Sequence, residues 1–187
     1  LASAQAPWPA RPIRILLPAP PGGTTDFLAR IFAQRMDLGQ PVIIEAKPGA
    51  SGNLAVDLVA KAPPDGYTLV VGAPGALAIN PSLFRKMPFD PQKDLTPIVL
   101  AARVPLLVAV HPSLPAANIA QLVALAKANP DRYTYGTPGP GTPQHLATEM
   151  FASMAGGKLR HIPYKGSGQS VADLLGGQID LAFEATV

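Results

Sequence analysis

The chain has 187 residues, of which 48% are hydrophobic and only 14% are charged. This balance excludes a disordered chain, and the length allows one domain, or one domain and part of another. The net charge is +3, the basic residues are scattered and aromatic residues make up 6%, which excludes the electrostatic surface of a nucleic-acid-binding protein. The lack of cysteine excludes disulfides, thiolate nucleophiles and cysteine-bound zinc or iron–sulfur clusters.

The two ends of the chain suggest processing and truncation. Residues 1–6, Leu-Ala-Ser-Ala-Gln-Ala, resemble the end of a secretory signal peptide, because they contain two small-x-small cleavage patterns. A flexible tail is the alternative. The longest apolar region, 98–110, is interrupted by Arg103 and Pro105 and is too short to span a membrane. A segment typical of a strand, 178–183, lies four residues from the end, so we expect the sequence to be cut inside a larger protein.

The first half of the chain predicts three strands separated by two helices. A short apolar strand over 13–17 leads through a Gly/Pro loop into residues 26–36, where apolar side chains recur with helical spacing. The next elements are a strand over 42–46, a helix over about 53–62 with Asn53 or Ser51 as N-cap, and a strand over 67–71. This alternation is typical of a parallel sheet covered by helices. Residues 74–97 are rich in turn-forming residues and are expected to be irregular.

The second half repeats this order after an extended segment over 98–110 that breaks near 103–105. Its expected elements are a helix from Asn118 to about 128, a strand over 133–135, a helix over 142–154, a strand over 159–162, a helix over 170–175 and a strand over 178–183. Both halves contain a Gly loop after the first strand of the repeat and a Lys-containing Gly loop after the second. Two similar α/β units joined near 101–105 predict two lobes with a cleft between them. Ligands of such sheets bind beyond the carboxyl ends of the strands.

Two glycine-rich loops are the candidate ligand-binding segments. The first, over 18–26, contains Gly22, Gly23, Thr24 and Asp26, and the second, over 136–142, has the same location and similar chemistry. Glycine lets the backbone approach a ligand closely, and the free N–H groups of a first helical turn favour an anion. Thr24 or the following Thr25 is expected to cap the first helix, whereas Asp26 suits an amine or a bridging water better than a carboxylate. A purely structural Gly turn is the alternative for the first loop.

Patterns for a nucleotide, a metal or a hydrolytic site are weak. Neither loop contains Gly-x-Gly-x-x-Gly, and Gly156-Gly-Lys158 lacks the rest of a P-loop. His145 and Glu149 have metal-ligand spacing on one helix, but no third ligand lies near them in the sequence. Ser167 has Lys165 two residues before it, where a Gly-x-Ser-x-Gly nucleophile elbow has glycine. We therefore expect no cofactor, no metal and no catalysis, and interpret His145 as a donor to an anion in the cleft or as an ordinary surface histidine.

Three further residues follow strand ends and are candidates for the cleft: Tyr164, Lys165 and Glu184. Lys165 would supply a cation for a second acidic group of a ligand, or would be a solvated lysine in a turn. Glu184 would be an acid facing the ligand, or the first residue of a helix that continues the chain.

Together these motifs resemble the periplasmic solute-binding proteins of tripartite tricarboxylate transporters, the Bug-type family. The similarity extends from Trp8 to Glu184. The matching stretches are Pro12-Ile-Arg-Ile, Pro-Gly-Gly-x-x-Asp-x-x-Ala-Arg30, Leu38-Gly-Gln-Pro-Val42, Glu45-x-x-Pro-Gly49, Pro64-Asp-Gly-Tyr-Thr-Leu69, Ile79-Asn-Pro-Ser-Leu83, Tyr135-Gly, His145-Leu146, Pro163-Tyr-Lys-Gly166 and Asp173-Leu-Leu-Gly-Gly-Gln178.

The resemblance implies an α/β, two-lobed periplasmic-binding-protein fold of type II, flytrap-like, with Rossmann-like parallel or mixed sheets, here truncated at the C-terminus. It implies a receptor, not an enzyme, that captures a small mono- or dicarboxylate in the periplasm and passes it to membrane transporter subunits. The family's ligand-holding positions correspond to Gly22, Gly23, Thr24 and Asp26 in one lobe, to Thr137, Gly141, Thr142 and His145 in the other, and to the loop Ala73-Pro74-Gly75.

Departures from the family pattern leave the identity of the acid open. Ala19 stands where relatives often have an aromatic that walls the pocket, and Pro74 and Gly75 replace small hydroxyl residues. Ala46-Lys47 replaces an Asn-Arg pair, and Glu184 replaces a shorter Asp.

The repeat and the resemblance together predict a division into residues 1–6 as a signal-peptide remnant or tail, 7–102 as lobe 1 and 103–187 as lobe 2, both lobes incomplete. Lobe 1 would then have an unpaired sheet edge and exposed apolar surface, so we expect this chain alone to close poorly. We expect a monomer that neither binds nucleic acid nor inserts into a membrane. The alternatives are a chemosensory or partner-binding module using the same cleft, and an enzyme with Asp26, His145 or Glu184 as its acid or base.

Overall fold

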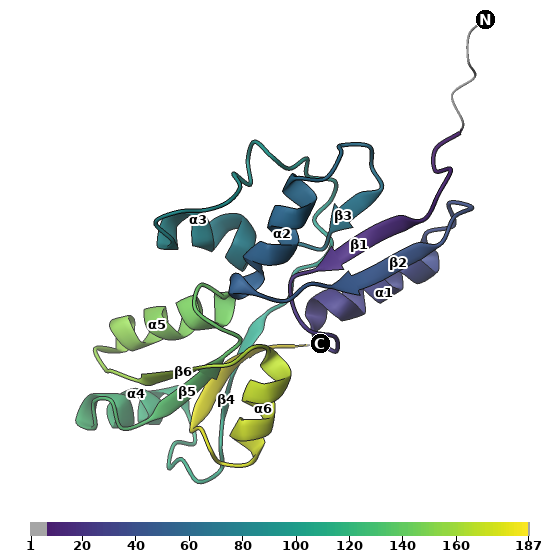
Figure 1. Cartoon of the computed structure of the whole chain (residues 1–187). Helices are drawn as coiled ribbons and strands as arrows, with labels where there is room; N and C mark the ends of the chain where they lie inside the picture. The colour runs from purple at the N-terminus through teal and green to yellow at the C-terminus, as the bar shows by residue number, and fades with distance from the viewer. Residues whose placement is uncertain (1–6, 187) are drawn as a thin grey trace, which may run out of the picture.

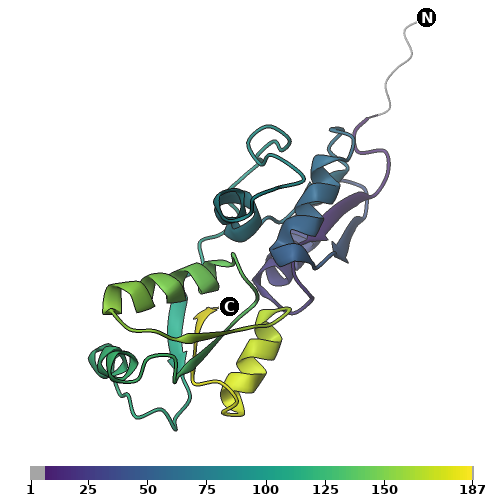
Figure 2. The same ribbon diagram turned by 60° about the vertical axis from the view of Figure 1, so that its left-hand side comes forward.

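The computed structural model describes residues 7–186 and consists of two α/β lobes arranged end to end (Figure 1). The expected signal-peptide remnant, residues 1–6, lies outside the described residues. None of the helices in the described part is both long and apolar enough to cross a membrane. Figure 2 shows that the lobes meet where the loops at the ends of their sheets approach each other.

Lobe 1 is built on a three-stranded parallel sheet with the order β2-β1-β3. Ile15 in the central strand is in register with Ile44 and Leu69 of its neighbours. The elements are β1 (Ile13–Leu17), α1 (Thr24–Arg35), β2 (Val42–Ala46), the 3₁₀ turn η1 (Ala50–Gly52), α2 (Asn53–Ala60) and β3 (Thr68–Val70). Because the chain moves from β1 to one edge and then crosses to the other, right-handed crossovers place α1 and α2 on opposite faces of the sheet.

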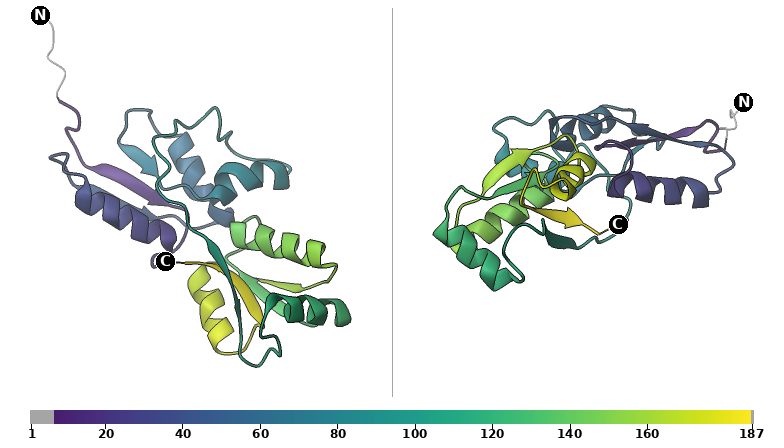
Figure 3. Two further views of the ribbon diagram at one scale, coloured as in Figure 1. Left: turned by 180° about the vertical axis from the view of Figure 1, so that it is seen from behind. Right: turned by 90° about the horizontal axis from the view of Figure 1, so that it is seen from below.

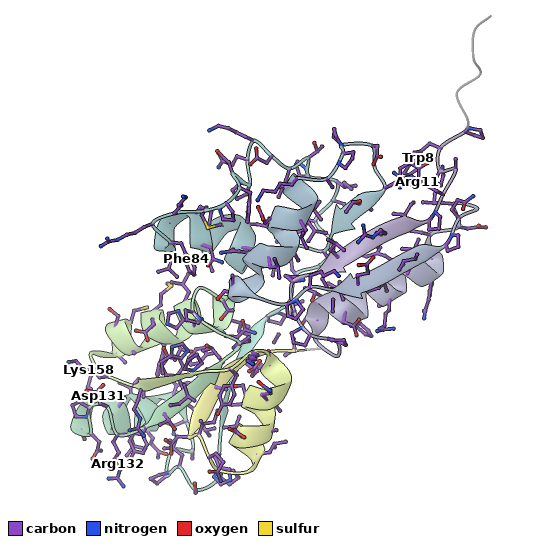
Figure 4. All side chains as sticks on the ribbon, viewed as in Figure 1. Trp8, Arg11, Phe84, Asp131, Arg132 and Lys158 are labelled. Atoms are coloured by element: carbon purple, nitrogen blue, oxygen red, sulfur yellow. The ribbon has the colours of Figure 1, made fainter. Side chains whose placement is uncertain are left out.

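The core of lobe 1 follows from this arrangement. The central strand β1 is apolar at four of its five positions, as expected of a strand covered on both faces. Ile15, Leu17 and Ala29 form the cluster under α1, while Val56, Ala76 and Phe89 form the cluster on the α2 side. The N-terminal segment is fixed at the outer end of the lobe, where Trp8 and Arg11 lie together (Figure 4) and the Arg11 guanidinium lies 4.1 Å from the centre of the Tyr67 ring.

The region expected to be irregular, 74–97, contains a helical stretch. A π-helical turn, η2 (Gly75–Ile79), runs directly into α3 (Asn80–Leu83). The sequence did not indicate it because Gly75 and Pro81 are unfavourable in isolated helices, whereas tertiary contacts bury Ala76 and Asn80 here.

Lobe 2 contains a mixed four-stranded sheet with the order β4-β7-β5-β6, in which β4 is antiparallel to β7 and the other pairs are parallel. The elements are β4 (Leu106–Val110), α4 (Ile119–Ala128), β5 (Thr134–Thr137), α5 (Pro143–Ala155), β6 (Arg160–Pro163), α6 (Ser167–Leu175) and β7 (Leu181–Ala185). Figure 3 (left) shows the connecting segment passing from lobe 1 into β4. Of the extended stretch predicted over 98–110, only β4 is a strand.

The predicted internal repeat is present in the topology. Strand order β2-β1-β3 in lobe 1 corresponds to β6-β5-β7 in lobe 2, and α5 and α6 take the places of α1 and α2. Leu122, Tyr135 and Leu181 belong to the core under α4 and α5, while Leu174 and Ile179 pack on the α6 side.

Two predicted helix caps are wrong and one is confirmed. The N-cap of α1 is Gly23, because Thr24 and Thr25 already lie within the helix. The N-cap of α2 is Gly52 in the left-handed conformation, since the Asn53 side chain instead accepts a hydrogen bond from Asn80. Asn118 caps α4 as predicted, with its side chain accepting from the N–H of Gln121.

Candidate functional site

A cleft lies between the lobes, where the loops at the carboxyl ends of the parallel strands face each other. Its walls come from Pro18–Thr25, Pro48–Gly52 and Gly72–Gly75 of lobe 1 and from Pro138–Pro140, Thr142–Gln144 and Tyr164–Gln169 of lobe 2. The hollow has a volume of about 2470 Å³ because it continues along the α1 side of lobe 1, past Leu28 and Phe32. Small-molecule sites are typically about 300–1,000 Å³, so the part between the loops is the candidate site.

The first glycine-rich loop presents backbone to open space. Methyl groups added at Gly22 or Gly23 would meet no atom within 4 Å. Gly22 has φ of 89°, a conformation that favours glycine. The N–H groups of the first turn of α1 have no acceptor within the helix, which makes this helix end suited to an anion.

Asp26 holds this loop in place. Its Oδ2 accepts the N–H of Gly22 at 2.9 Å, and Arg30 Nε lies 3.0 Å from its Oδ1. The hydrogen bond from Arg30, together with that from Gly22, lowers the pKa of the buried Asp26 carboxyl below its ordinary value. The ionised Asp26 carboxylate therefore stabilises the conformation of this loop. Asp26 is not among the residues that line the cleft.

The second loop is fixed by its own hydrogen bonds. Thr142 caps α5, accepting from the N–H of His145 at 3.4 Å and donating to the Gly139 carbonyl at 2.7 Å. The N–H of Gly139 donates to Thr137 Oγ1 at 3.2 Å, and Gly141 has φ of 77°. These bonds leave Gly139 and Thr142 on the cleft wall and place Thr137 and Gly141 behind it.

The structure brings most of the predicted site residues to one cleft, but not all. Those lining it are Ala19, Gly22, Gly23, Thr24, Pro74, Gly75, Thr142, Tyr164 and Lys165. Those outside the lining are Asp26, Thr137, Gly141, His145 and Glu184. Direct ligand contact by any of these residues stays a prediction.

His145 lies beneath the second loop. Its Nδ1 accepts the N–H of Gly141 at 3.3 Å, and its ring centre lies 4.5 Å from that of His161. His161 in turn shares a hydrogen with Thr137 Oγ1 over 2.6 Å, and burial, with the neighbouring His145, lowers its pKa. Glu149, considered with His145 as a metal-ligand pair, instead accepts a hydrogen bond from Tyr135. No group of three or more metal-ligating side chains occurs among residues 7–186.

Glu184 lies behind the wall formed by the first turns of α5 and α6. Burial raises the pKa of its carboxyl, and the nearby polar groups of Ser167, Ser170 and Gln144 offset part of this rise. Two of these three neighbours, Ser167 and Gln144, line the cleft.

The cleft wall is weakly charged. Among the described lining residues, Lys165 is the only basic side chain, it is exposed, and Asp94 is the only acidic one. Tyr164 donates its hydroxyl to Asp173 at 2.7 Å, and burial, with this hydrogen bond, raises its pKa to about 12. Tyr164 thus presents its ring rather than a free hydroxyl.

The polar lining residues that were not predicted as site residues include Ser51, Gln144 and Ser167. Ser167 is the first residue of α6 after Gly166, the same strand–glycine–helix signal that identified the two main loops, so it could have been found. Gln144 is in the first turn of α5, directly after the predicted loop. Ser51 was predicted only as a possible helix cap, because its place on the wall depends on a left-handed backbone at η1.

Chemically, this arrangement suits binding. Backbone N–H groups at helix N-termini, hydroxyls and one lysine can hold an anion through charge-assisted hydrogen bonds. Among the described residues, the cleft wall carries no histidine.

Comparisons with known proteins identify a family for this chain. A family model described as "Tripartite tricarboxylate transporter family receptor" matches residues 28–187. BugT of Bordetella pertussis is 40% identical over 175 residues, which are 92% of this chain and 54% of BugT. The solved structure of R. palustris Rpa4515 with adipate has a TM-score of 0.91 and 41% identity, covering 95% of this chain and 60% of that one. MatC of Rhodopseudomonas palustris with bound malate has a TM-score of 0.88 and 30% identity, covering 95% and 61%.

The chain thus spans about half the length of BugT and about three fifths of the two solved chains.

Proposed function

The chain belongs to the tripartite tricarboxylate transporter receptor family, and from this membership and the cleft we propose that it captures a small carboxylate between its lobes for delivery to a transporter. The fold is the two-lobed α/β fold of the periplasmic binding proteins. Capture takes place in the periplasm, by a monomer, and the partners are the membrane subunits of a tripartite tricarboxylate-type transporter. The receptor performs no catalysis.

The observation that carries this proposal is the open first loop opposite a basic side chain. The free N–H groups at the start of α1, with Gly23 and Thr24 on the wall, are suited to one carboxylate of the ligand. Lys165 and Ser167 on lobe 2 are suited to a second acidic group. A ligand that contacts both lobes binds the closed conformation more tightly than the open one, and binding therefore shifts the receptor toward the closed conformation.

A dicarboxylate fits this pairing better than a monocarboxylate. The relatives solved with adipate and malate carry acids with two carboxylates. Ala19 leaves the pocket wider than an aromatic side chain would, and Pro74 supplies no side-chain hydrogen-bond donor. The length of the acid that fits is therefore determined by measurement.

A thermal-shift screen of the whole protein against mono-, di- and tricarboxylates tests the proposal. A ligand at 100 times its Kd adds about 2.7 kcal/mol to the unfolding free energy, and hence raises Tm by a few degrees. We expect a selective shift with dicarboxylates, and no shift with any acid in a folded protein would contradict the proposal.

A matched pair of variants then tests the role of Lys165. Lys165→Gln should weaken dicarboxylate binding about tenfold, because it removes a charge-assisted hydrogen bond. Lys158→Gln is the control, since Lys158 is an exposed lysine at the far end of lobe 2 (Figure 4). Equal affinities of the two variants would remove Lys165 from the site.

A further inference from the structure

The second glycine-rich loop contacts lobe 1 at a junction with η2 and α3. A methyl group added at Gly141 would lie 2.1 Å from Asn80 Oδ1, and one added at Gly75 would lie 2.9 Å from the Gly141 carbonyl oxygen. A methyl group at Gly139 would lie 3.5 Å from Ser51 Oγ. The N-terminal end of α5 accordingly lies beside the N-terminal end of α2 in Figures 1 and 3. The lobes approach this closely only because the positions in contact are glycines.

Asn80 is the polar side chain at this junction. It is fully buried, although the three residues that follow it in α3 are exposed. Its Nδ2 donates to Asn53 Oδ1 at 2.7 Å, whereas its Oδ1 is buried without a hydrogen-bond partner among residues 7–186. A buried amide oxygen without a donor is destabilising, so this atom calls for an explanation.

The part of lobe 2 beside this oxygen is the backbone of Gly141, whose N–H is a candidate donor. That group donates to His145 Nδ1 over 3.3 Å, which is long for an N–H hydrogen bond. Rotation of the lobes on closing moves Asn80 relative to this N–H, which Asn80 Oδ1 can then share with His145 Nδ1. Gly139 and Thr142 of the same loop line the cleft, so a ligand that touches them also fixes the position of Gly141.

We propose that Asn80 is a positioning residue for lobe closure, whose Oδ1 accepts the N–H of Gly141 when the lobes close on a ligand. The inference rests on the proposed function. When the lobes are apart, water donates a hydrogen bond to Asn80 Oδ1. When the lobes close, this oxygen is buried, and closure is unfavourable unless the N–H of Gly141 donates to it. Asn80 does not line the cleft and therefore acts on the ligand only through the loop.

The test compares Asn80→Ala with Asn53→Ala in the whole protein, using whichever of adipate and malate shifts the wild type. Asn80→Ala should weaken binding tenfold or more and remove the ligand-induced decrease in radius of gyration measured by small-angle scattering. Asn53→Ala also removes the Asn53–Asn80 hydrogen bond but keeps the Asn80 oxygen, so it should bind within threefold of the wild type and still become compact.

Equal losses in both variants, or normal compaction of Asn80→Ala, would overturn the proposal. If Asn80→Ala does not fold, Gly75→Ala decides, because its added methyl meets the Gly141 carbonyl oxygen across the junction. It should keep the wild-type far-UV circular dichroism spectrum and lose the compaction, and retained compaction would overturn the proposal. If no acid of the carboxylate screen binds the wild type, both this inference and the proposed function are overturned, whereas wild-type binding with an unchanged Asn80→Ala overturns this inference alone.

Discussion

The two glycine-rich loops share a strand-to-helix pattern but differ in what surrounds them. The first has nothing within 4 Å of a methyl group at Gly22 or Gly23, and Asp26 fastens it from behind. The second is held by hydrogen bonds between Gly139 and the side chains of Thr137 and Thr142, and its Gly141 is pressed against lobe 1. The same strand–glycine–helix pattern therefore gives a loop whose backbone is open to a ligand in lobe 1 and a loop fixed by its own hydrogen bonds in lobe 2.

The strands that precede the loops account for much of this difference. In β1 the residue two before Pro18 is Leu16, which is buried in the core, whereas in β5 the residue two before Pro138 is Gly136. A methyl group at Gly136 would lie 2.5 Å from both Ile179 Cδ1 and Ser170 Oγ. Because β5 has glycine at this position, α6 and its neighbours pack directly against the strand backbone below the second loop.

Replacing Gly136 should give the largest effect on stability. Gly136→Ala should destabilise the chain by about 1–3 kcal/mol, because the added methyl overpacks a region with no room for it. Urea unfolding followed by circular dichroism measures the change. Gly168→Ala in α6 is the matched control, since a methyl there meets no atom within 4 Å, and it should be neutral or stabilising by less than about 1 kcal/mol. Equal effects of the two variants would contradict the packing explanation.

Removing the fastening of the first loop should have an intermediate effect. Asp26→Ala leaves the N–H of Gly22 without its acceptor and Arg30 without its partner, and should cost about 1 kcal/mol at pH 7. Because the folded-state pKa of Asp26 is lowered, its contribution is present above the unfolded-state value of about 3.9 and is lost as pH falls through the folded pKa. The difference between wild type and variant in urea unfolding should therefore shrink below pH 4. A difference that is constant from pH 7 to pH 3 would argue against an ionised role.

Much of the fold could be predicted from the sequence because its signals are local. Strands such as 13–17 and 42–46 are short apolar runs bounded by Pro, Gly or Lys, and both match the observed β1 and β2. The repeat in element order predicted the two lobes, and the resemblance predicted the family. The helical stretch from Gly75 to Leu83 could not be predicted in this way, because it depends on contacts with other parts of the chain.

The site was predictable to the level of loops but not of side-chain direction. Glycine between a strand and a helix correctly indicated which loops face the cleft. Asp26 and His145 turn away from it because each finds a partner in its own loop, the N–H groups of Gly22 and Gly141 respectively. Such choices depend on hydrogen bonds that form only once the backbone has taken positive φ at these glycines, which spacing in the sequence does not reveal.

The smallest expected effect concerns the Lys-containing loop of lobe 1, next to the first glycine-rich loop. Glu45 in β2 accepts hydrogen bonds from Arg14 Nε at 2.6 Å and Nη2 at 3.0 Å, with Lys47 Nζ at 3.4 Å. The bond from Arg14 is the main reason that the pKa of Glu45 falls to about 2.

A lowered folded pKa stabilises the protein above the unfolded value of about 4.3, and this contribution is lost as pH falls toward 2. Because the groups are partly exposed, solvent screening keeps it below about 1 kcal/mol. Glu45→Gln should therefore lower the urea midpoint slightly at pH 7 in low salt, and less in 1 M NaCl or near pH 2, whereas a loss independent of pH and salt would assign Glu45 a packing role instead.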